Sequence, residues 1–245
     1  MSYMDVYRLR LNRYGLNYQQ RIQTEREHLF ELYLLKTVYH VTFEYNGEMH
    51  EGSFEKYKQD ETKTLHYLLT KLDVKIPNGT ILDMPDNNKT DQIEKWMVYY
   101  LEEIQASGYN RYVMLRMTHL LHWLGRDDRW HEAWAYMYGQ EDNMLKDEIR
   151  SRSRMDTLYA ENLKMSFFVM PRNEFVRRDD YFIVGEKPFQ EYYRVTGYDI
   201  QSTENVEYVT VDPVYEFDLS APPEKEDEDD GADFFWFNGG DSDGT

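Results

Sequence analysis

The order of hydrophobic and polar residues predicts one helix near the N-terminus, followed by a long series of strands. Over residues 17–36, Ile22, Leu29, Tyr33 and Leu34 recur at helical spacing, and charged residues lie between them. This spacing is typical of an amphipathic helix that covers a core with one face.

After the helix the period of the pattern changes to two. Val41, Phe43 and Tyr45 alternate with polar residues, and Asn46-Gly47 follows them. Asn-Gly between two alternating runs predicts a tight hairpin, because both turn positions require a positive φ.

The pattern of short apolar runs continues to about residue 215. Further strands are expected at 49–54, 65–72, 80–84, 96–101, 112–123, 130–138, 163–170, 181–184, 192–200 and 206–215. A polar loop is expected over 85–91, a helical turn over 143–150, and a turn at Gly125 to Asp128 that joins two long runs in a hairpin. This series predicts a mainly β fold, an antiparallel β-barrel or sandwich with an N-terminal helix and an extended acidic C-terminal tail.

The predicted organisation has three parts. Residues 1–37 form an N-terminal arm and helix, 38–220 an antiparallel β-domain with long hairpins and loops, and 221–245 an acidic-aromatic tail. Hydrophobic residues make up 41% of the 245 residues, which is enough for a core.

Composition and charge exclude several classes of protein. The chain has no cysteine, which excludes disulfide scaffolds, thiolate zinc sites and cysteine nucleophiles. No apolar run approaches the roughly 18 residues of a membrane helix, and the first residues carry no apolar signal core. The net charge of −18 argues against wrapping a duplex by neutralising its phosphates.

The C-terminal tail combines acids with aromatic rings. Residues 221–245 hold nine acids and one base, and they include Phe234, Phe235, Trp236 and Phe237. One interpretation is a short linear motif that docks on a partner or a neighbouring subunit. The other is a terminal segment that packs back on its own domain. The acidic run that separates the rings from the body favours docking.

Basic residues concentrate in two places. Residues 1–22 contain one acid, Asp5, and four arginines: Arg8, Arg10, Arg13 and Arg21. This basic segment could pair with the acidic tail of a neighbouring subunit, or both ends could be solvated.

The second basic cluster is Arg150, Arg152 and Arg154. In an extended segment these alternate side chains would share one face. They could contact phosphates or an acidic partner. They could equally protect an exposed edge by their charge.

Three histidines raise the question of a metal site. His119 and His122 are three positions apart, and His131 follows. Residues three apart share a face on a helix but point to opposite faces of a strand. The Val, Thr and Trp content of the run favours a strand, so we expect surface or hairpin-flank histidines rather than zinc ligands.

We expect the acidic pairs of the sequence to be turn or surface residues rather than catalytic carboxylates. These pairs are Asp127-Asp128, with Glu132 nearby, Glu141-Asp142 and Asp179-Asp180. Trp123, Trp130 and Trp134 are expected to pack across a hairpin.

The sequence contains no G-x-S-x-G elbow, Walker loop or dinucleotide glycine fingerprint. We therefore assign no catalytic residue, cofactor or metal ligand and expect a non-enzymatic role.

Several strings together resemble the head-closure proteins (stopper or neck proteins) of tailed bacteriophages. The likeness runs over most of residues 1–220 and is carried by these strings: Asn12-Arg-Tyr-Gly15, Gly108-Tyr-Asn-Arg-Tyr112, Met137-Tyr-Gly-Gln-Glu-Asp-Asn-Met-Leu-Lys-Asp-Glu148, Glu161-Asn-Leu-Lys-Met-Ser-Phe-Phe-Val-Met-Pro171 and Tyr193-Arg-Val-Thr-Gly-Tyr-Asp-Ile200.

The resemblance implies a small antiparallel β-barrel in a ring, usually of twelve subunits, between the portal and adaptor on the head side and the tail proteins. Such a ring retains packaged DNA, offers the docking surface for the tail, and lets DNA pass without sequence-specific binding. The implied location is the virion, after synthesis in the host cytoplasm, with no membrane and no cofactor. This chain is long for a stopper, which leaves open a fusion of adaptor and stopper.

Two alternatives remain open. One is an acidic module that mimics DNA or binds another protein, which predicts a monomer or dimer with carboxylates spaced like phosphates. The other is a metal-dependent hydrolase that uses His119, His122 or His131, which predicts bound metal in the purified protein.

Overall fold

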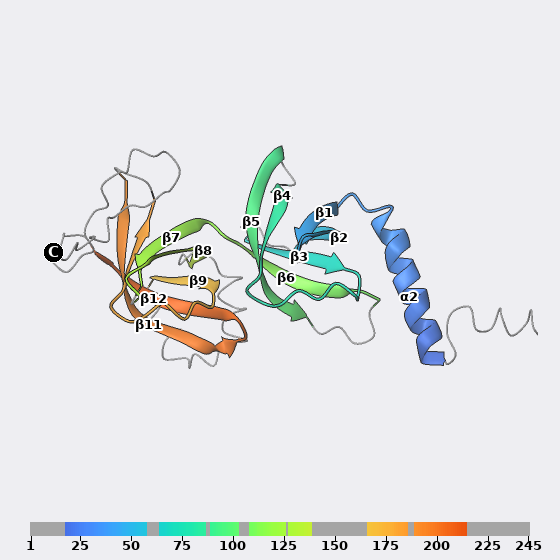
Figure 1. The fold of residues 1–245 in the computed structure, drawn as a ribbon. Coiled ribbons are helices and arrows are strands. Elements are labelled where there is room, and N and C mark those ends of the chain that lie inside the picture. Colours follow the sequence, from blue (N-terminus) through green and yellow to red (C-terminus); the bar gives the residue numbers. More distant parts are fainter. Residues whose placement is uncertain are drawn as a thin grey trace, which may run out of the picture. The chain divides into compact units, whose positions relative to one another are not determined.

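The structure, a computed structural model, describes residues 18–57, 64–86, 89–102, 108–125, 127–138, 166–185 and 189–214. The chain divides into two compact units, Met1–Arg116 and Met117–Thr245. Within the described residues, each unit contains one six-stranded antiparallel sheet, and one helix precedes the first sheet (Figure 1). The predicted mainly β, antiparallel barrel-type fold with an N-terminal helix is therefore confirmed.

The first unit begins with helix α2 (Tyr18–Leu34). Its six strands are β1 (His40–Tyr45), β2 (Glu48–Lys56), β3 (Leu65–Thr70), β4 (Ile81–Asp86), β5 (Lys89–Glu102) and β6 (Asn110–Arg116). They are hydrogen-bonded in the order β1-β2-β3-β6-β5-β4. The end strands β1 and β4 lie close to one another, so the sheet curls into a barrel-like form around its core.

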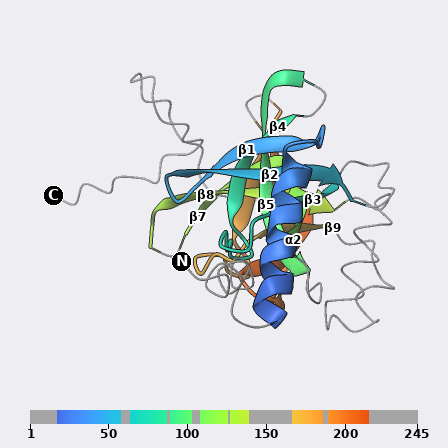
Figure 2. The ribbon, with the colours of Figure 1, turned by 90° about the vertical axis from the view of Figure 1, so that its right-hand side faces the viewer.

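Helix α2 packs on the outer face of this sheet (Figure 2). Phe30 and Leu34 are buried against Leu69 of β3. The Tyr33 hydroxyl contacts the Ser53 hydroxyl of β2 at 3.3 Å. A helix is present with nearly the bounds predicted, 17–36, but its buried face differs from the predicted one: Phe30 and Leu34 are buried, whereas Leu29 and Tyr33 are exposed.

The hairpin between β1 and β2 has the predicted turn. Asn46 has a φ of 54° and Gly47 a φ of 79°. A β-carbon at Gly47 would meet nothing within 4 Å, so the glycine serves the backbone conformation rather than close packing.

The core of the first unit lies on the inner face of the sheet. It is formed by Val41, Phe43, Phe54, Leu68, Val74, Ile76, Leu82, Met84, Trp96, Val98, Tyr112 and Met114. The buried hydroxyl of Tyr112 accepts from the Ile76 N–H and donates to the Val74 carbonyl, both at 3.0 Å. This side chain therefore ties the segment before β4 to the centre of the sheet.

The second unit is a closed barrel. Its strands are β7 (His119–Leu124), β8 (Trp130–Tyr138), β9 (Ser166–Pro171), β10 (Tyr181–Val184), β11 (Glu191–Thr203) and β12 (Val206–Val214). They follow one another around the barrel as β10-β11-β12-β9-β8-β7, and pairing of β10 with β7 closes it. A closed barrel leaves no open sheet edge.

The barrel interior holds a cluster of buried hydrophobic side chains, which forms the core of the second unit. Large members of this core include Trp123, Phe168 and Phe182, whose rings meet edge to face. Ring pairs in this arrangement add stabilisation beyond the area they bury.

Two strand predictions were wrong at their boundaries. The expected polar loop over 85–91 is largely strand, because β4 and β5 continue pairing to Asp86 and Lys89. The apolar run 112–123 is not one strand. It is divided between β6 and β7, which pair with different partners in different sheets.

The strands of the β-domain predicted over 38–220 are divided between the two units, because the boundary between the units follows Arg116. The expected helical turn over 143–150, the arm before Tyr18 and the tail over 221–245 lie outside the described residues. Within the described residues, no helix is both long and apolar enough to cross a membrane.

Candidate functional site at one end of the second barrel

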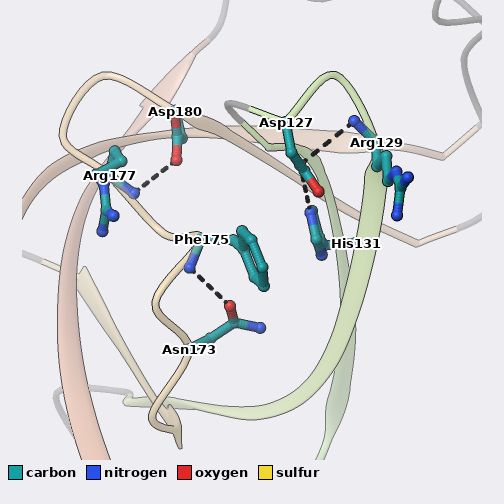
Figure 3. A network of polar contacts seen from close by, with 7 residues as sticks. All are labelled: Asp127, Arg129, His131, Asn173, Phe175, Arg177 and Asp180. Carbon is teal, nitrogen blue, oxygen red and sulfur yellow. Dashed lines mark hydrogen bonds and ion pairs between the residues drawn. The ribbon is translucent and has the colours of Figure 1, made fainter.

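Alternate connections of an antiparallel barrel meet at the same end. Here the β7–β8 turn, the β9–β10 loop and the β11–β12 turn lie together, and the first two carry the polar network of Figure 3. The Arg172 N–H donates to the Asn205 carbonyl at 2.9 Å, which joins the β9–β10 loop to the β11–β12 turn.

His131 is the centre of this end of the barrel. It lies on β8 directly opposite Trp123 of β7, and the two rings stack with centroids 5.6 Å apart. Phe175 of the β9–β10 loop stacks on the same imidazole at 4.4 Å. Nε2 of His131 is 2.8 Å from Oδ1 of Asp127, and this hydrogen bond holds the pKa of Asp127 below its ordinary value.

The β9–β10 loop is held by its own polar side chains. Oδ1 of Asn173 accepts from the Phe175 N–H at 3.0 Å, and Oδ2 of Asp180 accepts from the Arg177 N–H at 2.6 Å (Figure 3). Between them Val176 is 2% exposed and belongs to the barrel core. The loop therefore closes this end of the barrel with an apolar plug and a fixed backbone.

A buried acid lies beneath the loop. Glu207 of β12 is 2% exposed. It stands two positions before Val209, a core residue, so its side chain points to the same, inner face of the barrel. Its Oε1 accepts from the Asn173 N–H at 3.3 Å. Burial raises the pKa of Glu207 to about 7, against the opposing effect of that hydrogen bond and of Arg172 and Arg177.

The chemistry available here is limited by what surrounds the imidazole. A histidine–carboxylate pair can move protons when the imidazole reaches a reacting group. In this barrel the imidazole of His131 stacks with the rings of Trp123 and Phe175, and its Nε2 is hydrogen-bonded to Asp127. The pair is therefore best described as a clamp that fixes the β9–β10 loop on the β7–β8 turn.

The three candidate histidines do not form one site. His119 and His122 lie on β7, so they point to opposite faces, as predicted. Nδ1 of His119 is 2.7 Å from the Thr118 hydroxyl, and Nδ1 of His122 is 4.0 Å from Glu132. Burial lowers the pKa of both imidazoles, against nearby carboxylates. Among the described residues, no three His, Asp or Glu side chains are placed to hold a metal ion.

The acidic pairs behave as turn residues where the structure describes them. Asp128 has a φ of 56° and Asp179 a φ of 71°, both in connections between strands. Aspartate tolerates this left-handed region better than most residues. The other pair, Glu141-Asp142, lies outside the described residues.

The three tryptophans of the hairpin are divided between the two barrel faces. Trp123 points inward, opposite His131, whereas Trp130 and Trp134 have the outward parity and lie opposite Leu124 and Leu120. They therefore pack across the hairpin with other residues and not with one another.

Two groups of predicted contact residues lie outside the described residues. They are Arg150, Arg152 and Arg154, and the tail residues Phe234, Phe235, Trp236 and Phe237. Both remain predictions.

Phe175 and Glu207 were not identified from the sequence. Phe175 lies in a loop, and nothing in the local pattern shows which ring it meets. Glu207 did leave a signal, because it stands two positions before Val209 and four before Val211 in an alternating strand. An acid in that register indicates a charged group at a core position.

Comparisons with known proteins identify no family. No family model matches the sequence, and no curated protein matches it. Among solved structures, the chain has weak similarity to MrkH, described as a c-di-GMP-dependent transcription regulatory factor, at 8% identity and a TM-score of 0.23. That alignment covers 80% of this chain and 84% of MrkH.

Two c-di-GMP complexes give similar values. K. pneumonia MrkH with c-di-GMP has 6% identity and a TM-score of 0.24, covering 80% of this chain and 87% of the other. Borreliella burgdorferi PlzA with c-di-GMP has 5% identity and a TM-score of 0.24, covering 79% and 92%. Such low TM-scores do not establish a shared fold, so the ligand of those proteins is not transferred to this chain.

Proposed function

We propose that this chain is a structural protein of the head–tail connector of a tailed bacteriophage. It forms a ring between the portal–adaptor assembly and the tail, retains the packaged DNA, and offers the surface on which the tail docks. It is made in the host cytoplasm, acts in the virion, and contributes contacts rather than catalysis.

The observation that carries the proposal is the fold. The resemblance in sequence implies a small antiparallel β-barrel, and each unit of this chain is built on six antiparallel strands, closed into a barrel in the second. The chain is long for a stopper protein, and its two units suit a fusion in which one unit is the adaptor-like part and the other is the stopper-like part. The clamped loop at the end of the second barrel gives that barrel a rigid end suited to a fixed contact.

The charge supports the same role. Each copy carries a net charge of −18, so a ring of copies would surround its channel with negative potential. DNA phosphates find few partners on such a surface. Packaged DNA could then pass through the ring without adhering to it.

A phage with an amber stop codon at Trp96 tests the proposal. Without the protein we expect lysates of DNA-filled heads that lose their DNA, together with unattached tails, by negative-stain electron microscopy. A suppressor strain that restores the full chain is the control. Normal tailed virions under non-suppressing conditions would rule out the connector role.

A further inference from the structure

Exposed aliphatic side chains lie on the C-terminal half of helix α2 and in the connection that follows it. We call Leu29, Leu32, Leu35 and Val38 the α2 apolar stripe; these side chains are 58%, 38%, 82% and 88% exposed. Leu29 and Leu32 lie on the helix, where residues three apart are surface neighbours. Leu35 and Val38 come after the last helical residue, Leu34, so the stripe continues from the helix into the connection to β1.

The opposite side of the same helix explains why the stripe is unpartnered within its unit. Phe30 and Leu34 are each 5% exposed and pack on the sheet. Figure 2 shows α2 in front of the strands, with one side turned toward them. The core contact of the helix is thus complete without the stripe, and contiguous exposed apolar surface of this kind marks interaction sites.

The chain itself contains a segment of matching chemistry. Phe234 to Phe237 are four consecutive aromatic residues flanked by acids. Phe234 follows Val214, the last residue of β12, by twenty positions, so an extended connection reaches up to about 66 Å. The segment can therefore reach surfaces well beyond its own barrel.

Charge favours the same pairing. Residues 221–245 carry nine acids and one base, whereas residues 1–22, which lead into α2, carry four arginines and one acid. These opposite charges favour association of the tail of one copy with the N-terminal part of another. Such charges steer association and fix orientation more than they add affinity.

We propose that the Phe234–Phe237 segment of a second copy of this chain binds the α2 apolar stripe. The choice of a second copy rests on the proposed function, because a ring places identical copies side by side. Each copy then gives one tail and receives one, which is a head-to-tail contact that closes when the ring closes. Repetition around the ring multiplies a contact that is weak in a single pair.

Because the sequence contains no cysteine, a disulfide can form only between cysteines that are introduced for the test. Two full-length variants, Val38→Cys and Phe235→Cys, are purified separately, mixed in equal amounts and mildly oxidised. The matched control mixes Phe235→Cys with Phe189→Cys, since Phe189 of the second unit is 84% exposed and lies outside the stripe. We expect the Val38–Phe235 heterodimer to form at least about tenfold faster than the control, from the raised effective concentration of a docked segment.

A further variant separates apolar docking from mere proximity. Leu35→Asp added to the Val38→Cys chain is expected to bring the cross-linking rate down to that of the control. Met49→Asp, at a site 66% exposed on β2, is expected to leave the rate unchanged. Circular dichroism checks that each variant keeps its fold.

Two results would overturn the inference. One is an equal rate at Val38 and Phe189. The other is a Val38→Cys/Phe235→Cys double variant that forms only intrachain disulfides, which would assign the stripe to the tail of the same copy. Light scattering on the same samples keeps the two proposals apart, because a ring without the selective cross-link refutes only the tail contact. A monomer that cross-links selectively refutes only the ring.

Discussion

Replacing Glu207 by glutamine should make the stability of the second barrel less sensitive to pH. Glu207 is 2% exposed, and burial raises its pKa to about 7 from an ordinary value of 4.5. Folded Glu207 therefore keeps its proton up to about pH 7, whereas the unfolded chain releases it near pH 4.5. Between these values the folded state binds more protons, so the stability of the wild-type protein falls as pH rises.

The size of the effect follows from the two pKa values. Their difference corresponds to about 3 kcal/mol of stability that is present at pH 4.5 and lost by pH 7 to 8. Glutamine has nearly the same shape and an oxygen that can accept from the Asn173 N–H, but it does not ionise. Glu207→Gln should therefore be more stable than the wild type above pH 7 and close to it near pH 4.5.

Urea denaturation followed by circular dichroism at a series of pH values measures this difference. With an m-value of about 2 kcal/mol/M, the midpoint of Glu207→Gln should exceed that of the wild type by ~1.5 M at pH 8. Glu204→Gln, at an exposed position of the adjacent turn, is the matched control and should follow the wild-type curve. Parallel pH curves for Glu207→Gln and the wild type would refute the assignment of a buried, protonated acid.

Three further substitutions test other parts of the structure. Tyr112→Phe removes the hydroxyl that bridges two backbone groups of the segment before β4, and should cost about 1–3 kcal/mol in urea denaturation, because those groups stay buried. Gly52→Ala should lower the melting temperature, since its β-carbon would lie 2.7 Å from the Leu69 carbonyl oxygen; unchanged melting would contradict that packing. Asp127→Asn removes a carboxylate whose pKa is held low by His131, so the loss of stability below about pH 4 should be smaller in the variant than in the wild type, by fluorescence-monitored acid titration.

Local chemistry made much of the fold predictable. The Asn46-Gly47 turn was identified because few residue pairs accept two positive φ values in succession. The opposite faces of His119 and His122 followed from strand alternation. Each of these features depends on neighbours in the sequence and not on distant partners.

Features set by distant pairing were not predictable in this way. The run 112–123 has no glycine or proline to mark its interruption, so its division between β6 and β7 shows only in their different partners. His131 was identified as a candidate residue, but its role was not. Its contact with Phe175 depends on a loop that the barrel closure brings to the same end.

The mass of the purified full-length protein tests the connector role most directly. Light scattering after size exclusion would be recorded for the protein alone and after mixing with the portal–adaptor ring of its phage. We expect a ring, roughly 360 kDa for twelve copies of 29.7 kDa, either alone or when the adaptor is present. A stable monomer of 29.7 kDa that ignores the adaptor would contradict the account.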